Sequence, residues 1–312
     1  MSQIASSPIT QVAPMQTPQM PEQTFPTRLS LELRGTRFEI DREMLMSLPE
    51  SILIVMFPNG LIIGRGAIDP YGEEVSDGDT SSEDSEGLED QVIYVNFDPA
   101  CLTFILEFYQ KAQEAFYSNH QGGGASAYPP SVQNPLLNKQ AIIVLREELD
   151  YFTIPPKSKK VVVDVASYLR DNNSDVESVI DLYTLKSECG VHLLNQKKIF
   201  TALQRNVNKE NNAAEQHLID MLCVSGFSRD DEWGYRNIEP QRTSIVSIAL
   251  VMLKTTGQSN QMATAQKLLL FWRKPARKCW WDGVEVSIGE EDNPTKVRLW
   301  CRRTWTLELA LV

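Results

Sequence analysis

The chain has 312 residues, of which 42% are hydrophobic, and a formal net charge of −11 at pH 7. This length predicts about two domains, and the apolar content is enough to build their cores. Ten acidic residues and no Lys or Arg lie in 69–91, so the rest of the chain is nearly neutral and gives no sign of nucleic-acid binding.

Five widely spaced cysteines, with no Cys-x-x-Cys pair, predict a reducing and therefore cytoplasmic compartment, with neither a disulfide framework nor a zinc site. The first residues lack the basic and apolar regions of a secretory signal. The longest uncharged stretch, 51–64, is too short to span a bilayer. Membrane association is therefore expected only indirectly, through a partner.

The first half predicts one domain, 29–156, after a Gln- and Pro-rich disordered N-terminus, 1–28. Alternating Leu29, Leu31 and Leu33 predict a strand, Gly35-Thr36 a turn, 37–40 a second strand, and the apolar run after Pro49 a helix. A further strand is predicted at 92–97, with Asp98 and Pro99 starting a helix. The last helix of this domain is predicted at 136–154. Two flexible inserts, 69–91 and 118–135, interrupt the domain.

The second half predicts a mixed domain, 157–312, so that the whole chain is α+β. Helices are predicted within 174–190, 212–227 and 260–274, and also at 242–253, despite the β-branched residues there. Asp282-Gly283, between two short apolar runs, predicts a hairpin turn. Trp305, Leu307, Leu309 and Leu311 alternate as one face of a strand. The expected result is a small antiparallel sheet packed on helices.

No recognised catalytic or cofactor motif occurs. The chain has no P-loop, no GxGxxG, no HExxH and no GxSxG, and its three histidines are scattered. Asp77 and Asp79 resemble a phosphatase DxDx[TV] motif, but they lie in the acidic insert rather than at the end of a buried strand. The prediction is therefore a protein that is not an enzyme and has no catalytic residue, cofactor or metal.

Two segments are candidates for regulation or binding. In the acidic insert, Thr80 and Ser81 each have an acidic residue three positions later, as acid-directed kinases require; the alternative is a solvated spacer. Near the C-terminus, basic and aromatic residues of the types enriched in binding hot spots occur together. The alternative for these is that the tryptophans form the core and the basic residues its outer surface. The candidate partner-binding residues are Arg273, Lys274, Arg277, Lys278, Trp280, Arg302 and Arg303.

The opening stretch resembles a BTB/POZ domain of the KCTD type. The similar residues include Leu31, Leu33, Gly35, Thr36, Arg37 and Phe38, then Leu45, Pro49, Ser51, Leu53, Met56 and Phe57, then Asp98, Phe104, Ile105, Leu106 and Phe108, and a late helix with Arg146, Glu147, Tyr151 and Phe152. Arg34 replaces one glycine of the usual pair. The resemblance implies self-association and partner binding, and hence a homo-oligomer.

The whole arrangement, from the Gln/Pro-rich start to the ending VRLWCRRTWTLELALV, resembles the fungal growth-regulator family. That resemblance implies an adaptor in stress and nutrient signalling. Its partner would be a plasma-membrane phosphatase of the haloacid dehalogenase type, and it would restrain growth that depends on the target-of-rapamycin kinase. The alternatives are a BTB substrate adaptor of a cullin-type ubiquitin ligase, or a protein that binds membrane surfaces through its basic and aromatic C-terminus.

Overall fold

The structure, a computed structural model, describes residues 27–61, 92–120, 135–172, 179–210, 212–253, 261–289 and 294–312. The N-terminus and the acidic insert 69–91, with Thr80 and Ser81, lie outside the described residues, except for positions 27 and 28. The second predicted insert is shorter than expected, because 118–120 belong to a helix and Pro135 opens a 3-10 turn.

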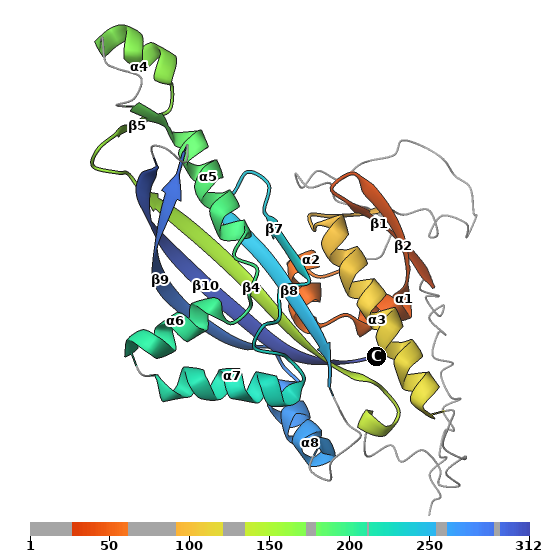
Figure 1. Cartoon of the computed structure of the whole chain (residues 1–312). Coiled ribbons are helices and arrows are strands. Elements are labelled where there is room, and N and C mark those ends of the chain that lie inside the picture. The colour runs from red at the N-terminus through yellow and green to blue at the C-terminus, as the bar shows by residue number, and fades with distance from the viewer. Residues whose placement is uncertain are drawn as a thin grey trace, which may run out of the picture.

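The N-terminal part forms a three-stranded sheet with three helices (Figure 1). Its order is β2-β1-β3, with β1 antiparallel to β2 and parallel to β3. The predicted strands, the helix after Pro49 and the helix that begins at Pro99 are confirmed. The bounds are β1 Arg28–Leu33, β2 Thr36–Asp41, α1 Arg42–Ser47, α2 Glu50–Met56, β3 Val92–Val95 and α3 Pro99–His120.

The β1–β2 turn lies one residue earlier than predicted. Leu33 pairs with Thr36, so Arg34 and Gly35 form a two-residue turn, with φ values of 46° and 87°. Positive φ at both positions is typical of the type I′ hairpin turn. The Arg34 guanidinium donates to Glu239 at 2.6 Å and to Asn96 at 2.9 Å. The contact with Glu239 attaches the turn to the C-terminal part of the chain, and the contact with Asn96 attaches it to the segment between β3 and α3.

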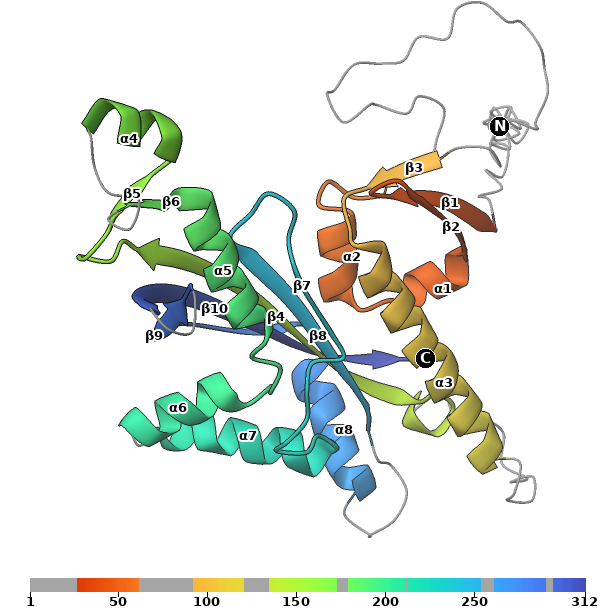
Figure 2. The ribbon, with the colours of Figure 1, turned by 45° about the horizontal axis from the view of Figure 1, so that its top comes forward.

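The C-terminal part is built on a five-stranded antiparallel sheet in the order β7-β8-β4-β10-β9 (Figures 1 and 2). A two-stranded parallel sheet, β5-β6, lies at one end beside α4 and α5. The α+β class and the antiparallel sheet are confirmed. The bounds are η1 Pro135–Leu137, β4 Ala141–Ile154, β5 Lys160–Val162, α4 Val165–Asn172, β6 Val179–Asp181, α5 Leu182–Leu194, α6 Thr201–Glu210, α7 Ala213–Ser225, β7 Tyr235–Ile238, β8 Ser244–Met252, α8 Gln261–Trp272, β9 Ala276–Ile288 and β10 Thr295–Leu311.

Three sequence predictions are wrong here. Residues 136–154 and 242–253 are not helices but contain strands β4 and β8, and the late helix of the BTB resemblance is therefore absent. Both strands have paired neighbours on each side, and much of their length is buried on both faces, so the apolar residues form runs in place of an alternation. Asp282-Gly283 is not a turn but lies within the continuous strand β9, where Asp282 forms an ion pair with Arg205 at 3.0 Å.

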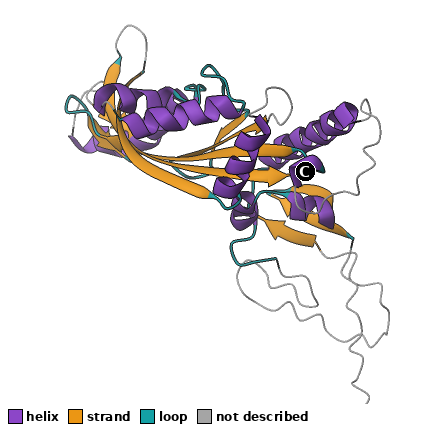
Figure 3. Cartoon of the chain, turned by 90° about the horizontal axis from the view of Figure 1, so that it is seen from below, coloured by secondary structure: helices purple, strands orange, loops and turns teal. Residues whose placement is uncertain are grey.

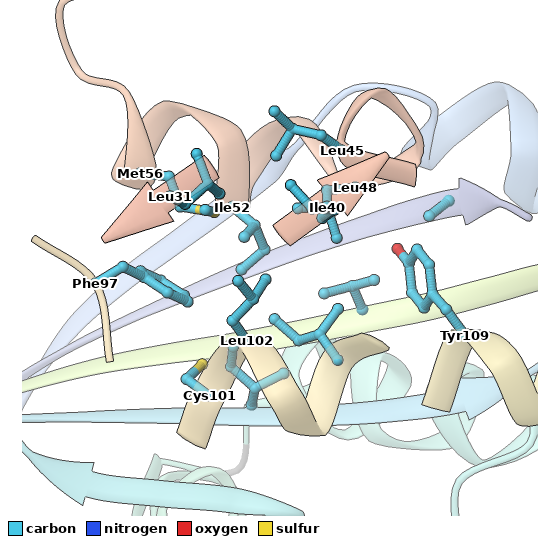
Figure 4. Packing of buried hydrophobic residues seen from close by; sticks show 14 of the residues in the cluster. Leu31, Ile40, Leu45, Leu48, Ile52, Met56, Phe97, Cys101, Leu102 and Tyr109 are labelled. Carbon is cyan, nitrogen blue, oxygen red and sulfur yellow. The ribbon is translucent and has the colours of Figure 1, made fainter. Parts of the chain in front are cut away.

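Different elements cover the two faces of the large sheet (Figure 3). Helices α5 to α8 pack on one face, where they form two apolar clusters with the strands. The N-terminal part packs on the other face, and Figure 4 shows side chains of β1, β2, α1 and α2 facing those of α3, such as Leu102 and Tyr109. This cluster also contains Ile142 and Val144 of β4, Ile248 of β8 and Ala310 of β10. The N-terminal part and the large sheet thus share one core, while the domain boundary at 156 stays a prediction.

Helix α2 begins against strand β10. Its N-cap residue, Pro49, provides no side-chain hydrogen bond, and the buried Glu308 carboxylate takes that role. One Glu308 oxygen accepts from the Glu50 amide at 2.6 Å, and the other accepts from the Ser51 amide at 2.9 Å. The free N–H groups of the first helical turn are thereby bonded, and the positive end of the helix dipole faces a carboxyl group.

Gly226, at the end of α7, has φ 138°, and a Cβ there would lie 2.9 Å from Val251 Cγ2. We therefore expect Gly226→Ala to lower the free energy of unfolding by about 1–3 kcal/mol. Gly283→Ala is the matched control, because a Cβ on Gly283 meets nothing within 4 Å, and it should change stability by less than about 0.5 kcal/mol. Urea unfolding of both variants would measure this, and equal losses would contradict the explanation.

Candidate partner-docking face

The part of the large sheet beyond the N-terminal part carries three exposed aromatic rings. Phe152 of β4 pairs directly with Trp300 of β10, and Trp281 of β9 pairs with Arg302 of β10. Paired residues, and residues two apart in one strand, point to the same face. We call this surface the aromatic face; it consists of Phe152, Ile154, Trp281, Gly283, Trp300 and Arg302.

The rings of the aromatic face are close together and about half accessible. Phe152, Trp281 and Trp300 are 51%, 55% and 47% exposed, and the ring centroids of Phe152 and Trp281 are 6.0 Å apart. Gly283 lies opposite Trp300 and leaves open space beside it. Large aromatic side chains next to a shallow open position are typical of protein-binding surfaces.

An arginine borders these rings. The Arg302 guanidinium donates to Asp150 Oδ2 through Nη2 at 2.7 Å and through Nε at 3.1 Å. The pair stays accessible, because the Arg302 side chain is 51% exposed. It therefore holds the guanidinium on the face that carries Trp281, while contributing little to folding stability.

Alternation along the same strands places these large apolar side chains on one face and their sequence neighbours on the other. Tyr151, Leu299 and Cys301, which are sequence neighbours of the exposed rings, point to the opposite face and pack in the cluster under α5. The strands are thus anchored on one side only at this end of the sheet. Figure 3 shows the helices on one side of the sheet and, at this end, none of the described helices on the other.

A buried polar network lies on the helix-covered face of the same strands. Arg236 donates to one Glu147 oxygen at 2.8 Å, and the other oxygen accepts from Arg303 at 3.0 Å and from the Trp305 indole at 2.9 Å. Burial by itself would raise the pKa of Glu147, but the charges of Arg303 and Arg236 outweigh it and lower that pKa below its ordinary value. Both Glu147 oxygens are bonded inside the protein, so the network links β4 to β7 and β10 and offers no surface for a partner.

The structure divides the predicted partner-binding residues among four places. Arg273, Lys274 and Arg277 are exposed between the end of α8 and the start of β9, and Arg302 lies on the aromatic face. Lys278 binds Glu215 of α7 at 2.9 Å. Trp280 and Arg303 are buried, Trp280 in the apolar cluster with Trp305 and Arg303 against Glu147. Those two do not belong to an accessible surface, and a binding role for the others stays a prediction.

The aromatic face was not identified from the sequence, although the signal was present. Trp280 and Trp281 are adjacent, and in a strand adjacent side chains point to opposite faces, so one of them had to point outward if the other was core. The mistaken turn at Asp282-Gly283 hid this, because it divided β9 in two. Phe152 was placed in a helix, where its pairing with Trp300 could not be seen.

Within the described part of the chain, no helix is long and apolar enough to cross a bilayer. In the same residues, no three His, Cys, Asp or Glu side chains gather as metal ligands would.

No family model matches the chain. It is 35% identical to a WHI2-like protein of Schizosaccharomyces pombe over 89% of this chain and 86% of that protein. It is 24% identical to a Saccharomyces cerevisiae protein named growth regulation protein, over 91% of each chain. An uncharacterised S. pombe protein is also 24% identical, over 92% of this chain and 88% of the relative.

Proposed function

Because the chain belongs to the family of WHI2-like fungal proteins, we propose that it is a non-enzymatic adaptor in growth regulation that docks a protein partner on its aromatic face. The exposed cluster of Phe152, Trp281 and Trp300 carries this proposal. A cytoplasmic protein gains by exposing three large rings together only where a partner covers them. In support, one relative is named growth regulation protein, and neither that name nor the name WHI2-like refers to a reaction.

The partner that we propose is a membrane-anchored phosphatase of the haloacid dehalogenase type, as the family resemblance implies. Through it the adaptor would be recruited to the plasma-membrane periphery, support the stress response and restrain growth dependent on the target-of-rapamycin kinase when amino acids are scarce. The BTB-like N-terminal part would supply self-association. Trp and Arg residues such as Trp300 and Arg302 are the types that dominate binding energy in protein interfaces.

The test is to purify the tagged protein from its own cells, fed and amino-acid-starved, and to identify its partners by mass spectrometry. We expect the wild-type chain to recover the phosphatase. The Trp281→Ser/Trp300→Ser variant should lose it, because removing a central aromatic anchor typically weakens binding about 30-fold or more.

The matched control is Tyr183→Ser/Val224→Ser, which removes two side chains of similar exposure, 67% and 72%, from helices on the opposite side of the sheet. This variant should bind as the wild type does. Recovery of a cullin and ubiquitin machinery in place of the phosphatase would make the chain a ligase adaptor. Equal phosphatase recovery by all three proteins would remove the aromatic face from the proposal.

A further inference from the structure

Helix α8 has an outward face that its own fold leaves uncovered. Leu270 and Phe271 are 83% and 74% exposed, and Leu270 is more exposed than any other large hydrophobic residue in the described part of the chain. Lys267, Leu270 and Phe271 follow the i, i+3, i+4 spacing of one helical face, and Lys274 follows two residues after the helix ends at Trp272. We call these four residues the α8 outer face.

The inner face of the same helix accounts for its position. Ala265, Leu268 and Trp272 are buried in the cluster that contains Trp305 of β10. These three residues anchor α8 to the sheet, so Leu270 and Phe271 are not needed for packing. Figures 1 and 2 show α8 at the outside of the molecule, beside α7 and away from the N-terminal strands.

The charge around α8 is opposite to that of the whole chain. Residues 254–281 contain six basic residues and no Asp or Glu, in a chain of net charge −11. Within the described residues, Lys267, Arg273 and Lys274 form no ion pair. Their charge is therefore available to an anionic surface, while the acidic residues of the chain lie in other segments.

From these observations we propose that the α8 outer face binds anionic phospholipid bilayers directly, with Leu270 and Phe271 entering the headgroup region and Lys267, Arg273 and Lys274 meeting lipid phosphates and carboxylates. An exposed apolar pair flanked by lysines is the arrangement of helices that lie in the membrane interface. Basic residues near such a surface each add roughly a fivefold increase in affinity at low salt. The helix lies in the interface and does not span the bilayer.

This contact goes beyond the adaptor function, because it needs no protein partner. The α8 outer face and the aromatic face lie on opposite sides of the large sheet, since Trp272 packs against the side of β10 that carries Trp305 and not the side that carries Trp300. A membrane at α8 therefore leaves the aromatic face free. Loss of either contact alone would be distinguishable from loss of the other.

The experiment uses the purified full-length chain and vesicles of phosphatidylcholine with or without 30% phosphatidylserine, read by co-sedimentation over a range of salt concentrations. We expect binding only to the phosphatidylserine vesicles, and a steep fall in binding as salt increases. Lys267→Glu/Lys274→Glu should weaken binding at least about tenfold. Leu270→Ser/Phe271→Ser should weaken it as much.

The matched control for charge is Lys111→Glu/Lys139→Glu, which makes the same change of net charge at exposed positions elsewhere. It should bind as the wild type does, and circular dichroism should show that every variant is folded. The proposal is overturned if the wild type ignores phosphatidylserine vesicles at low salt, or if the control loses as much binding as the α8 variants. It is also overturned if the α8 variants change only the oligomeric state in sedimentation velocity, which would make this face a contact between copies of the chain.

Discussion

Replacing Glu147 by Gln is expected to lower the free energy of unfolding by about 3–5 kcal/mol, because the change leaves two buried guanidinium groups without their counter-charge. Arg236 and Arg303 both bind this carboxylate, and the side chains of both are about 5% exposed or less. Urea unfolding followed by tryptophan fluorescence would measure the change. Asp150→Asn is the control on the same strand: it breaks an exposed pair with Arg302 and should cost less than about 1 kcal/mol.

The same residue gives a sign for the pH dependence of stability. The pKa of Glu147 is lower in the folded protein than its ordinary value of 4.5, so its contribution is fully present above pH 4.5 and is lost as the pH falls through the lowered pKa. We expect the wild-type chain to lose stability in that acidic range and Glu147→Gln to lose less there. Parallel acid curves for the two proteins would contradict the assignment.

Replacing Glu308 by Ala is expected to cost about 3 kcal/mol, since two backbone amides at the start of α2 lose a carboxylate acceptor in a buried setting. Glu308→Gln should cost about half as much, because one amide oxygen can still accept. Burial raises the pKa of Glu308, so its pH effect is opposite in sign to that of Glu147: the stability linked to its protonation is fully present below pH 4.5 and is lost as the pH rises through the raised pKa. The hydrogen bonds from the Glu50 and Ser51 amides offset part of this burial cost.

Hydrogen exchange separates this effect from general destabilisation. The Glu50 and Ser51 amides should exchange much faster in Glu308→Ala, while amides in β9 keep their wild-type rates under native conditions. The control is Glu285→Ala on β9. The Glu285 side chain is 64% exposed and forms a long ion pair with Lys296 at 3.8 Å, so its loss should lower the free energy of unfolding by less than about 1 kcal/mol. Uniformly faster exchange throughout the sheet would mean that Glu308→Ala destabilises the whole protein and does not act through the start of α2.

The sequence predicted best where an element had one solvent face or a distinct end. The alternation of Leu29, Leu31 and Leu33 gave β1, and Asp98 with Pro99 gave the start of α3. The predictions failed in β4 and β8, because strands buried on both faces lose the period-2 pattern and their apolar runs fit a helix equally well. Asp282-Gly283 failed for another reason: a turn-forming pair can stand in a strand when Arg205 neutralises the buried aspartate.

The aromatic face could not be predicted from local sequence patterns, because it depends on which strands pair with one another. Phe152 and Trp300 are far apart in sequence, and only the register of β4 with β10 places them side by side. Arg303 looked like part of a basic surface in the sequence, whereas its partner Glu147 lies on a strand that had been predicted as a helix. Long-range pairing thus decided which basic and aromatic residues are accessible.

The position of β10 in the centre of the sheet also has a consequence for synthesis on the ribosome. Strand β4 emerges from the ribosome well before β10, one of its two partners in the sheet. The two strands pair along their length, from Arg298 with Ile154 to Leu311 with Ala141. Until β10 emerges, the nascent chain holds an apolar strand with an open edge, a state that favours aggregation and chaperone binding. We expect a nonsense mutation anywhere before β10 to yield a chain that is degraded rather than a working fragment, since the missing strand also carries the Glu308 cap of α2.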